Sequence, residues 1–378
     1  MHVCQGRSFL TDAARAVEEA TESWDTTPLD LIILFCSTEQ DPAAVAAAVK
    51  ERFPGVLTIG CTTAGEHLTG AHSNKSLVIT GVSSPEITWT AACVHNVSTY
   101  TAEDAEETAQ GLFDQLGADP DELDPSRYFS MLLIDGLRMR EEAVASALAD
   151  ALQGVPLVGG SAGDDLKFTE TAVIFNGESV TDAAVVVLAE SAVPFSIIKH
   201  QHFTTTPQTL VVTRADPDKR TVHELDGYPA LEAYARALGM APEAVTSDVA
   251  FLHPVTFTSN HEIYVRSVQS IGDDGSLVFY CAVEEGMVLD VGGHHDMVDM
   301  LAADLDRIRG ELGKAELLIA FNCILRSLEA IGAEQHCALG ELLQETAVAS
   351  IGFDTYGEQL NGLHINQTLV ALAIGKAA

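Results

Sequence analysis

Short apolar runs rich in valine, isoleucine and leucine alternate with amphipathic stretches along most of this chain. Continuous apolar runs of this length are typical of strands buried on both faces, and amphipathic stretches between them are typical of helices. The pattern predicts strands at residues 29–36 and 128–134, followed by helices at 41–52 and 140–152. The sequence therefore predicts an α/β protein of mixed sheets and helices.

The order of predicted elements repeats along the chain. Residues 29–95 and 128–202 both show a strand, a helix, a glycine-rich strand end and three further strands, which indicates an internal duplication. In the second copy, Asn176-Gly177 predicts a hairpin turn between strands at 171–175 and 183–188.

Three regions follow from this pattern. We expect a helical N-terminal extension (1–28), the duplicated α/β region (29–205) and a second α/β region (206–378). A chain of 378 residues is long enough for two or three such domains.

A glycine-rich strand-end motif occurs in both α/β regions. Ile59-Gly-Cys-Thr-Thr-Ala-Gly-Glu66 aligns without gaps to Ile351-Gly-Phe-Asp-Thr-Tyr-Gly-Glu358, with five of eight positions identical. Ligands of open α/β sheets bind beyond the carboxyl ends of strands, so these ends are candidate ligand sites. The alternative is that they are tight turns that the fold requires. The candidate residues are Cys61, Thr62, Thr63, Glu66, Ser161, Asp164, Tyr356 and Glu358.

The charge balance restricts the partners of the protein. The chain has 55 acidic and 20 basic residues, for a formal net charge of −35. This excess argues against nucleic acids and anionic membranes as partners, because both are bound by basic patches. No apolar run is long enough to cross a bilayer, the N-terminus lacks a signal-peptide pattern, and the seven cysteines include no CxxC pair. We therefore expect a soluble cytoplasmic protein with reduced thiols.

One motif offers a nucleophile. Gly159-Gly-Ser161-Ala-Gly163 matches the G-x-S-x-G elbow of serine hydrolases, which lies between a strand and a helix. The element predicted after it is a strand, at residues 171–175, so the context of an elbow is missing. A serine hydrolase that uses Ser161 is therefore a minor alternative.

Two arginines could recognise an acidic ligand. Arg266 lies inside an apolar strand, and Arg326 follows the end of another. Either guanidinium could hold a ligand carboxylate, or could form an internal ion pair with Glu66, Asp164 or Glu358. A cleft shared by both arginines would favour an amino-acid or organic-acid ligand.

A collinear set of motifs spans nearly the whole chain from residue 29. The chain resembles proteins with FIST N and FIST C domains. The resemblance rests on residues 59–66, Leu133-Ile-Asp-Gly136 with Glu141-Glu142, residues 157–165, Glu224-Leu-Asp-Gly-Tyr-Pro-Ala230, Tyr264-Val-Arg-Ser267, Cys323 with Arg326, Tyr356-Gly-Glu358 and residues 362–368.

The resemblance implies a function. FIST domains are regarded as intracellular sensory domains that bind small ligands, which implies a non-enzymatic sensor in signal transduction. Stand-alone members with both domains resemble nitric-oxide-sensing haem proteins. That likeness implies non-covalent haem b as cofactor and a separate histidine kinase as partner. A binding module for amino acids or small organic acids is the alternative.

Three histidines are candidate ligands of a haem or metal. His200 and His202 lie two residues apart on a predicted strand and so share a face, which suits two ligands of one metal. A solvated strand face is the competing interpretation. His364 follows the Asn361-Gly362 turn beside the last strand end, and could act as a single axial ligand of haem.

Overall fold

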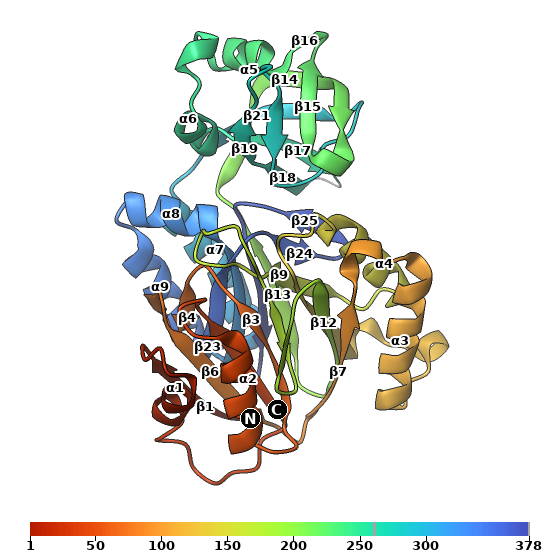
Figure 1. Ribbon diagram of the computed structural model, residues 1–378, viewed down its shortest axis with the longest axis vertical. Helices are drawn as coiled ribbons and strands as arrows, with labels where there is room; N and C mark the ends of the chain where they lie inside the picture. The colour runs from red at the N-terminus through yellow and green to blue at the C-terminus, as the bar shows by residue number, and fades with distance from the viewer. Residues whose placement is uncertain (260–261, 377–378) are drawn as a thin grey trace.

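The computed structural model describes residues 1–259 and 262–376. Within these residues, three six-stranded mixed sheets form a body, and a smaller β-rich insert sits at one end of this body (Figure 1). The predicted fold class, mixed sheets with helices, is confirmed. No helix in the described part of the chain combines the length and the apolar character needed to cross a bilayer.

The body consists of three units with the same order of elements. Each unit has an edge strand, a helix, a central strand, a second helical segment, a strand parallel to the central one, and a final antiparallel strand. The first unit contains β1 (His2–Ser8), α1 (Ala13–Ala20), β2 (Leu31–Cys36), α2 (Pro42–Arg52), β3 (Leu57–Thr62) and β6 (Leu77–Ser83). The second contains β7 (Ile87–His95), α3 (Ala102–Leu116), β8 (Tyr128–Ile134), α4 (Glu141–Ala151), β9 (Leu157–Ser161) and β12 (Ala183–Ser191). The third contains β13 (Phe195–His200), α7 (Met297–Leu312), β22 (Ala315–Cys323), α8 (Ile324–Gly332), α9 (His336–Thr346), β23 (Ala347–Thr355) and β26 (Leu369–Ile374).

Each unit also sends a short hairpin to a neighbouring sheet. The hairpins are β4–β5 (Glu66–Leu68, Ala71–Ser73), β10–β11 (Val173–Phe175, Glu178–Val180) and β24–β25 (Glu358–Leu360, Leu363–Ile365). Strand β4 pairs with β23 of the third unit, β10 with β3 of the first, and β24 with β9 of the second. The exchange is cyclic, so no unit completes its sheet without another.

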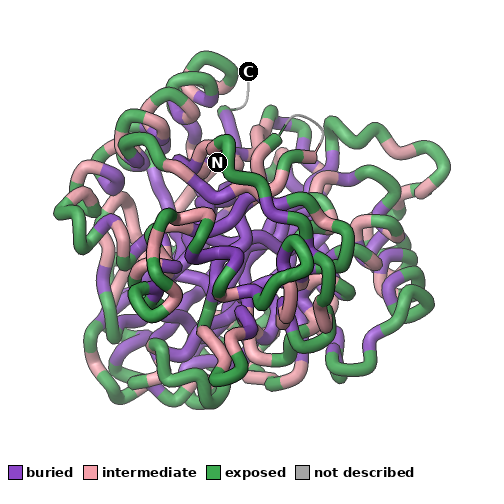
Figure 2. The backbone as a smooth tube through the Cα atoms, turned by 90° about the horizontal axis from the view of Figure 1, so that it is seen from above, coloured by how far each residue is buried: buried purple, intermediate pink, exposed green. Residues whose placement is uncertain are grey.

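The interior of the body lies between the three sheets. Strands β2 and β8 are buried along their whole length, because helices cover one face and the other sheets cover the second face. The inner faces meet in one apolar core, in which Phe35 and Phe321 both pack against Phe353. The buried residues fill the centre of the molecule in the view from above (Figure 2).

The insert interrupts the third unit between β13 and α7. It contains β14 (Phe203–Asp216), β15 (Thr221–Leu225), β16 (Tyr228–Pro229), α5 (Ala230–Leu238), α6 (Ser247–Leu252), β17 (Val255–Ser259), β18 (Glu262–Arg266), β19 (Val268–Ile271), β20 (Leu277–Phe279) and β21 (Val288–His294). It has an apolar core of its own, around Tyr234 and Phe279. The insert is therefore a separately packed element between two parts of one unit.

Several predicted details need correction. The Asn176-Gly177 turn exists, but it joins β10 to β11, while residues 183–188 lie in β12 of another sheet. The extension at residues 1–28 is not only helical, because β1 precedes α1 and pairs with β6. Strands β7 and β13 each begin the following unit, because they pair with the last strand of that unit, β12 and β26. The sequence-based repeat had placed them at the end of the preceding one.

Candidate functional site

The three strand ends singled out in the sequence meet inside the body. Backbone amides of each end donate to carbonyls of the next: Ala64 to Asp354 (3.1 Å), Tyr356 to Ser161 (3.0 Å) and Gly163 to Thr62 (3.0 Å). These hydrogen bonds link the three strand ends in a ring. The strand ends therefore pack against one another, and the ligand roles predicted for their side chains remain predictions.

Two glutamates of these ends have matching surroundings. Glu66 accepts hydrogen bonds from Thr63 Oγ1 (2.5 Å) and from the backbone and side chain of Ser76 (3.1 and 2.6 Å). Glu358 accepts hydrogen bonds in the same way from Thr355 (2.5 Å) and Thr368 (3.2 and 2.5 Å). Burial raises the pKa of Glu66 to about 7 and that of Glu358 to about 8. Neither carboxylate pairs with Arg266 or Arg326.

The other residues of the strand ends are held internally as well. Tyr356 donates to Asp164 (2.5 Å), which also accepts from three backbone amides at 2.6–3.0 Å. Although burial opposes the shift, these hydrogen bonds hold the pKa of Asp164 below its usual value. Cys61 is fully buried, and burial raises the pKa of its thiol well above the usual range.

Ser161 lacks the setting of a hydrolase nucleophile. Its side chain is fully buried, and its Oγ accepts a hydrogen bond from Gln359 Nε2 (2.8 Å). Strand β10 follows β9, so the strand–helix context of an elbow is absent in the described part of the chain, as predicted.

His200 and His202 are buried rather than solvated, so the competing interpretation of an exposed strand face is wrong. His200 Nδ1 lies 2.9 Å from Asp304 on α7, and His202 Nε2 lies 2.8 Å from Glu329 on α8. Burial lowers the pKa of His200 to about 4. Each ring thus has its own carboxylate partner on a different helix.

A large cleft separates the body from the insert. It has a volume of about 780 Å³ and is lined by residues of α4, of the β24–β25 hairpin and of the insert. Strand β25 lies directly below β18 of the insert (Figure 1). The chemistry of the lining is mixed: arginines and carboxylates lie beside Phe257, Met287 and Val288.

Arg266 and His364 are the predicted site residues that line this cleft, and Arg266 supplies a charge. Its guanidinium is buried, stacks 4.7 Å from the ring centroid of Phe257, and donates through Nη1 to two backbone carbonyls, of Val265 (3.1 Å) and His364 (3.3 Å). Its Nε has no hydrogen-bond partner, and no carboxylate is within ion-pair distance among the described residues. Arg266 is therefore a buried cation without a counter-charge.

Arg220 also lines the cleft and was not among the site residues predicted from the sequence. Arg220 of the insert pairs with Glu141 (2.6 Å) and Glu142 (2.7 Å) of α4. Glu142 also accepts a hydrogen bond from the backbone amide of Ala282 (2.7 Å). The Glu141-Glu142 pair at the predicted helix start was visible in the sequence, but its partner 78 residues away was not.

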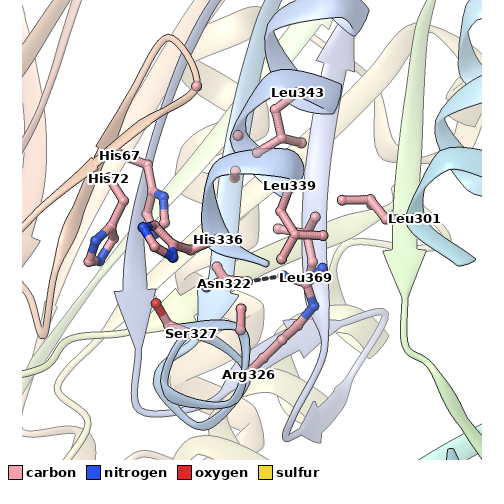
Figure 3. A pocket seen from close by; sticks show the side chains of 14 residues that line it. His67, His72, Leu301, Asn322, Arg326, Ser327, His336, Leu339, Leu343 and Leu369 are labelled. Atoms are coloured by element: carbon pink, nitrogen blue, oxygen red, sulfur yellow. Dashed lines mark hydrogen bonds between the residues drawn. The ribbon is translucent and has the colours of Figure 1, made fainter. Parts of the chain in front are cut away.

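Arg326 lines a different pocket. This pocket is smaller, about 40 Å³, and lies among α7, α8, α9 and β4–β5 (Figure 3). Arg326 Nη1 donates to Asn322 Oδ1 (2.6 Å), while Nε and Nη2 have no partner among the described residues. The two arginines therefore do not share one cleft.

Comparison with known proteins identifies the family of the chain. Residues 30–228 match the FIST N domain, and residues 230–361 match the FIST C domain. The chain belongs to the FIST family. Domains of this family sense small ligands in signal transduction.

Other similarities are more distant. An uncharacterized protein of Methanocaldococcus jannaschii, MJ1623, is 27% identical over 175 residues, which is 43% of this chain and 33% of that protein. The chain thus matches about a third of the length of that relative. The crystal structure of a cyanuric acid hydrolase from A. caulinodans superposes with a TM-score of 0.41 at 9% identity, over 99% of each chain.

The two FIST regions meet at the large cleft. Arg140, Glu142 and Arg220 come from the FIST N region, and Arg266 and Met287 come from the FIST C region. A ligand in this cleft would touch both regions at once.

The family resemblance implied a haem, with His200, His202 and His364 as candidate ligands. Of these three histidines, only His364 lines the large cleft. Its Nδ1 lies 3.1 Å from Gln359 Nε2. A Cβ added to Gly357 would lie 2.7 Å from His364 Nε2, so this nitrogen faces the backbone of Gly357. His364 Nε2 is buried and has no hydrogen-bond partner among the described residues, and one nitrogen of this ring lies within 4.8 Å of ligand atoms of Glu142 and Cys281, so the imidazole keeps one nitrogen that could act as a ligand. Haem binding by this FIST protein remains a prediction.

Proposed function

We propose that this protein is a sensor that binds a small carboxylate ligand, an amino acid or organic acid, in the cleft between body and insert. The observation that carries the proposal is Arg266, a buried guanidinium that lines the cleft without a carboxylate partner among the described residues. A ligand carboxylate would supply the missing charge through a charge-assisted, bidentate pair.

The energetics favour an anion at this position. An uncompensated buried charge costs several kcal/mol, which a paired and hydrogen-bonded ligand would offset. Arg220 is not free for this role, because Glu141 and Glu142 already neutralise it. Phe257, Met287 and Val288 offer apolar surface for the rest of the ligand. Exposed Asp218 and Glu284 also line the cleft and could accept an ammonium group.

The position of the cleft suits a sensor. Polar contacts join the insert to the body: the Arg220 pairs, Arg266 to the carbonyl of His364, and Ser267 Oγ to Gln367 (2.6 Å). Polar interfaces between separately packed units permit relative motion. A ligand that contacts both the insert and the body would therefore change the position of the insert relative to the body. We propose that a separate signalling protein, such as a histidine kinase, detects this change, and that the protein has no catalytic step of its own.

A thermal-shift screen of the full chain tests the proposal. The panel contains amino acids, dicarboxylic acids and the corresponding amides, with haem as a separate arm. At a hundredfold excess over Kd, a binding acid should raise Tm by about 3 °C or more, and its amide should not. If no acid stabilises the protein, the proposal fails. Saturable haem uptake, with a Soret band that shifts with nitric oxide, would support the haem alternative instead.

A further inference from the structure

A second cluster of ligating side chains lies away from the large cleft. His67 and His72 are directly opposed on the β4–β5 hairpin, and both rings point at Asp354 of β23. His67 Nε2 lies 2.7 Å from Asp354 Oδ1, and His72 Nε2 lies 2.9 Å from Oδ2. Figure 3 shows the two rings side by side at the edge of the smaller pocket.

Gly65 lies against this cluster at a position where a side chain would not fit. A Cβ on Gly65 would lie 2.5 Å from Asp354 Oδ2, 2.9 Å from His72 Nε2 and 3.0 Å from Asn74 Oδ1. A side chain at position 65 would collide with these atoms, so the glycine allows Asp354, His72 and Asn74 to lie close together. Asn74 can supply a further oxygen from the same loop.

The related hairpins show that the fold does not require this trio. In each sheet the hairpin lies beside an equivalent glycine: His67 faces Gly352, Gln359 faces Gly159, and Ile174 faces Gly60. At equivalent positions, the sheet of the second unit has Gln359, His364 and Ser161, and the sheet of the first unit has Ile174, Ser179 and Thr62. Only one of the three described hairpins brings two imidazoles to a carboxylate.

The carboxylate of this cluster is oriented by a further hydrogen-bond chain. Asn322 Nδ2 donates to Asp354 Oδ1 (2.7 Å), and Arg326 donates to the other end of the Asn322 amide. Such outer partners are typical of metal sites, where they fix the direction of the ligating groups. Arg326 lines the same pocket as both histidines, and its Nε and Nη2 have no hydrogen-bond partner among the described residues.

We propose that His67 Nε2, His72 Nε2 and the Asp354 carboxylate bind a divalent transition metal, with Zn²⁺ as the representative ion. Two imidazoles and one carboxylate form a set that Zn²⁺ accepts, whereas Mg²⁺ and Ca²⁺ prefer oxygen ligands alone. Asn74 Oδ1 or water fills the fourth position. The three ligand atoms lie within 4.8 Å of one another, and the nitrogen–oxygen pairs at 2.7 and 2.9 Å would separate by about half an ångström to hold a metal at about 2.0–2.2 Å.

Titration calorimetry with Zn²⁺ on the metal-free full chain tests this site. The variants are His67→Gln, which copies the glutamine of the related hairpin, and His72→Gln. The exposed loop residue His295 gives the matched control His295→Gln. We expect one Zn²⁺ per chain for wild type and for H295Q, and affinity at least tenfold weaker for H67Q and H72Q.

A second readout does not depend on the variants. Co²⁺ bound to the wild-type protein should show the visible absorption bands of a tetrahedral site, and Zn²⁺ should abolish them. The proposal is overturned if the wild type binds no stoichiometric metal, or if folded H67Q and H72Q bind Zn²⁺ as tightly as H295Q. Circular dichroism establishes that the variants are folded.

Discussion

At the scale of single residues, some buried polar side chains have hydrogen-bond partners, and others keep polar atoms without a partner. Glu66 and Glu358 each accept three hydrogen bonds from hydroxyl and amide groups, and neither has an ion-pair partner among the described residues. Arg266 and Arg326 are the opposite case, because both keep guanidinium nitrogens without acceptors in the described part of the chain. The first pair holds the fold together, and the second pair marks candidate ligand sites.

Glu358 should make stability depend on pH. Its folded pKa, about 8, lies above the value of about 4.3 in an unfolded chain, so the folded state holds the proton more tightly. The stability that Glu358 contributes to the folded state is fully present below about pH 4 and is lost as the pH rises toward 8. Between pH 5 and pH 8, the free energy of unfolding measured with urea should fall by about 1–3 kcal/mol more for the wild type than for Glu358→Gln, because the glutamine cannot ionise.

The exposed residue Glu345 provides the control, because Glu345→Gln should follow the wild type at every pH. Parallel pH profiles for wild type and E358Q would contradict the assignment.

The sequence predicted some site residues and missed others for physical reasons. Arg266 stood out as a charge inside an apolar strand, and the structure places it in the cleft. His67 and His72 were missed, although two histidines on either side of a Thr69-Gly70 turn are a readable signal. Their third partner, Asp354, lies 282 residues from His72, and one sequence contains no sign of that contact.

At the scale of elements, the three units share a close approach of backbones. Gly60, Gly159 and Gly352 each face the carbonyl oxygen of the neighbouring parallel strand, and an added Cβ would lie 2.1, 2.0 and 2.3 Å from it. The equivalent glycines therefore let each sheet close tightly at the point where a hairpin from another unit joins it.

The close approach of the backbones at Gly159 predicts that substitutions of two different glycines change the stability in opposite directions. Gly159→Ala should lower the free energy of unfolding by about 2–4 kcal/mol, because the buried strands β8 and β9 would have to separate. Gly111→Ala in α3 meets nothing within 4 Å and should raise stability by about 0.5–1 kcal/mol. Thermal and urea unfolding of both variants measure the difference, and equal stabilities would refute the packing argument.

Most individual strands and helices could be predicted, but their assembly could not. The strand predicted at residues 29–36 and the helix predicted at 41–52 correspond to β2 and α2, whose bounds in the structure differ by only one or two residues. The exchanged hairpins have strands of only three residues and pair with units far away in sequence. The insert also separates β13 from α7, which hides that the third unit repeats the first two.

At the scale of the whole molecule, the insert and the body are joined by charges. Arg220 reaches from the insert to Glu141 and Glu142 on α4, at the edge of the large cleft. Breaking one partner of a buried pair costs about 3–5 kcal/mol, so this contact holds much of the interface together.

Arg220→Gln should loosen the insert without unfolding the body. Amide hydrogen exchange should become faster in segments 217–225 and 282–288, while β22 in the body keeps its protection. The exposed residue Arg214, which pairs with Glu224 of the insert, gives Arg214→Gln as the matched control. Unchanged exchange in R220Q would show that other contacts dominate the docking.

Above all, we propose that Arg266 binds an acid between the insert and the body. Calorimetric titration of the strongest acid from the screen into wild type, Arg266→Gln and Arg214→Gln tests it most directly. We predict one site per chain, with affinity at least tenfold weaker in R266Q and unchanged in R214Q. Equal affinity of wild type and R266Q would contradict the claim.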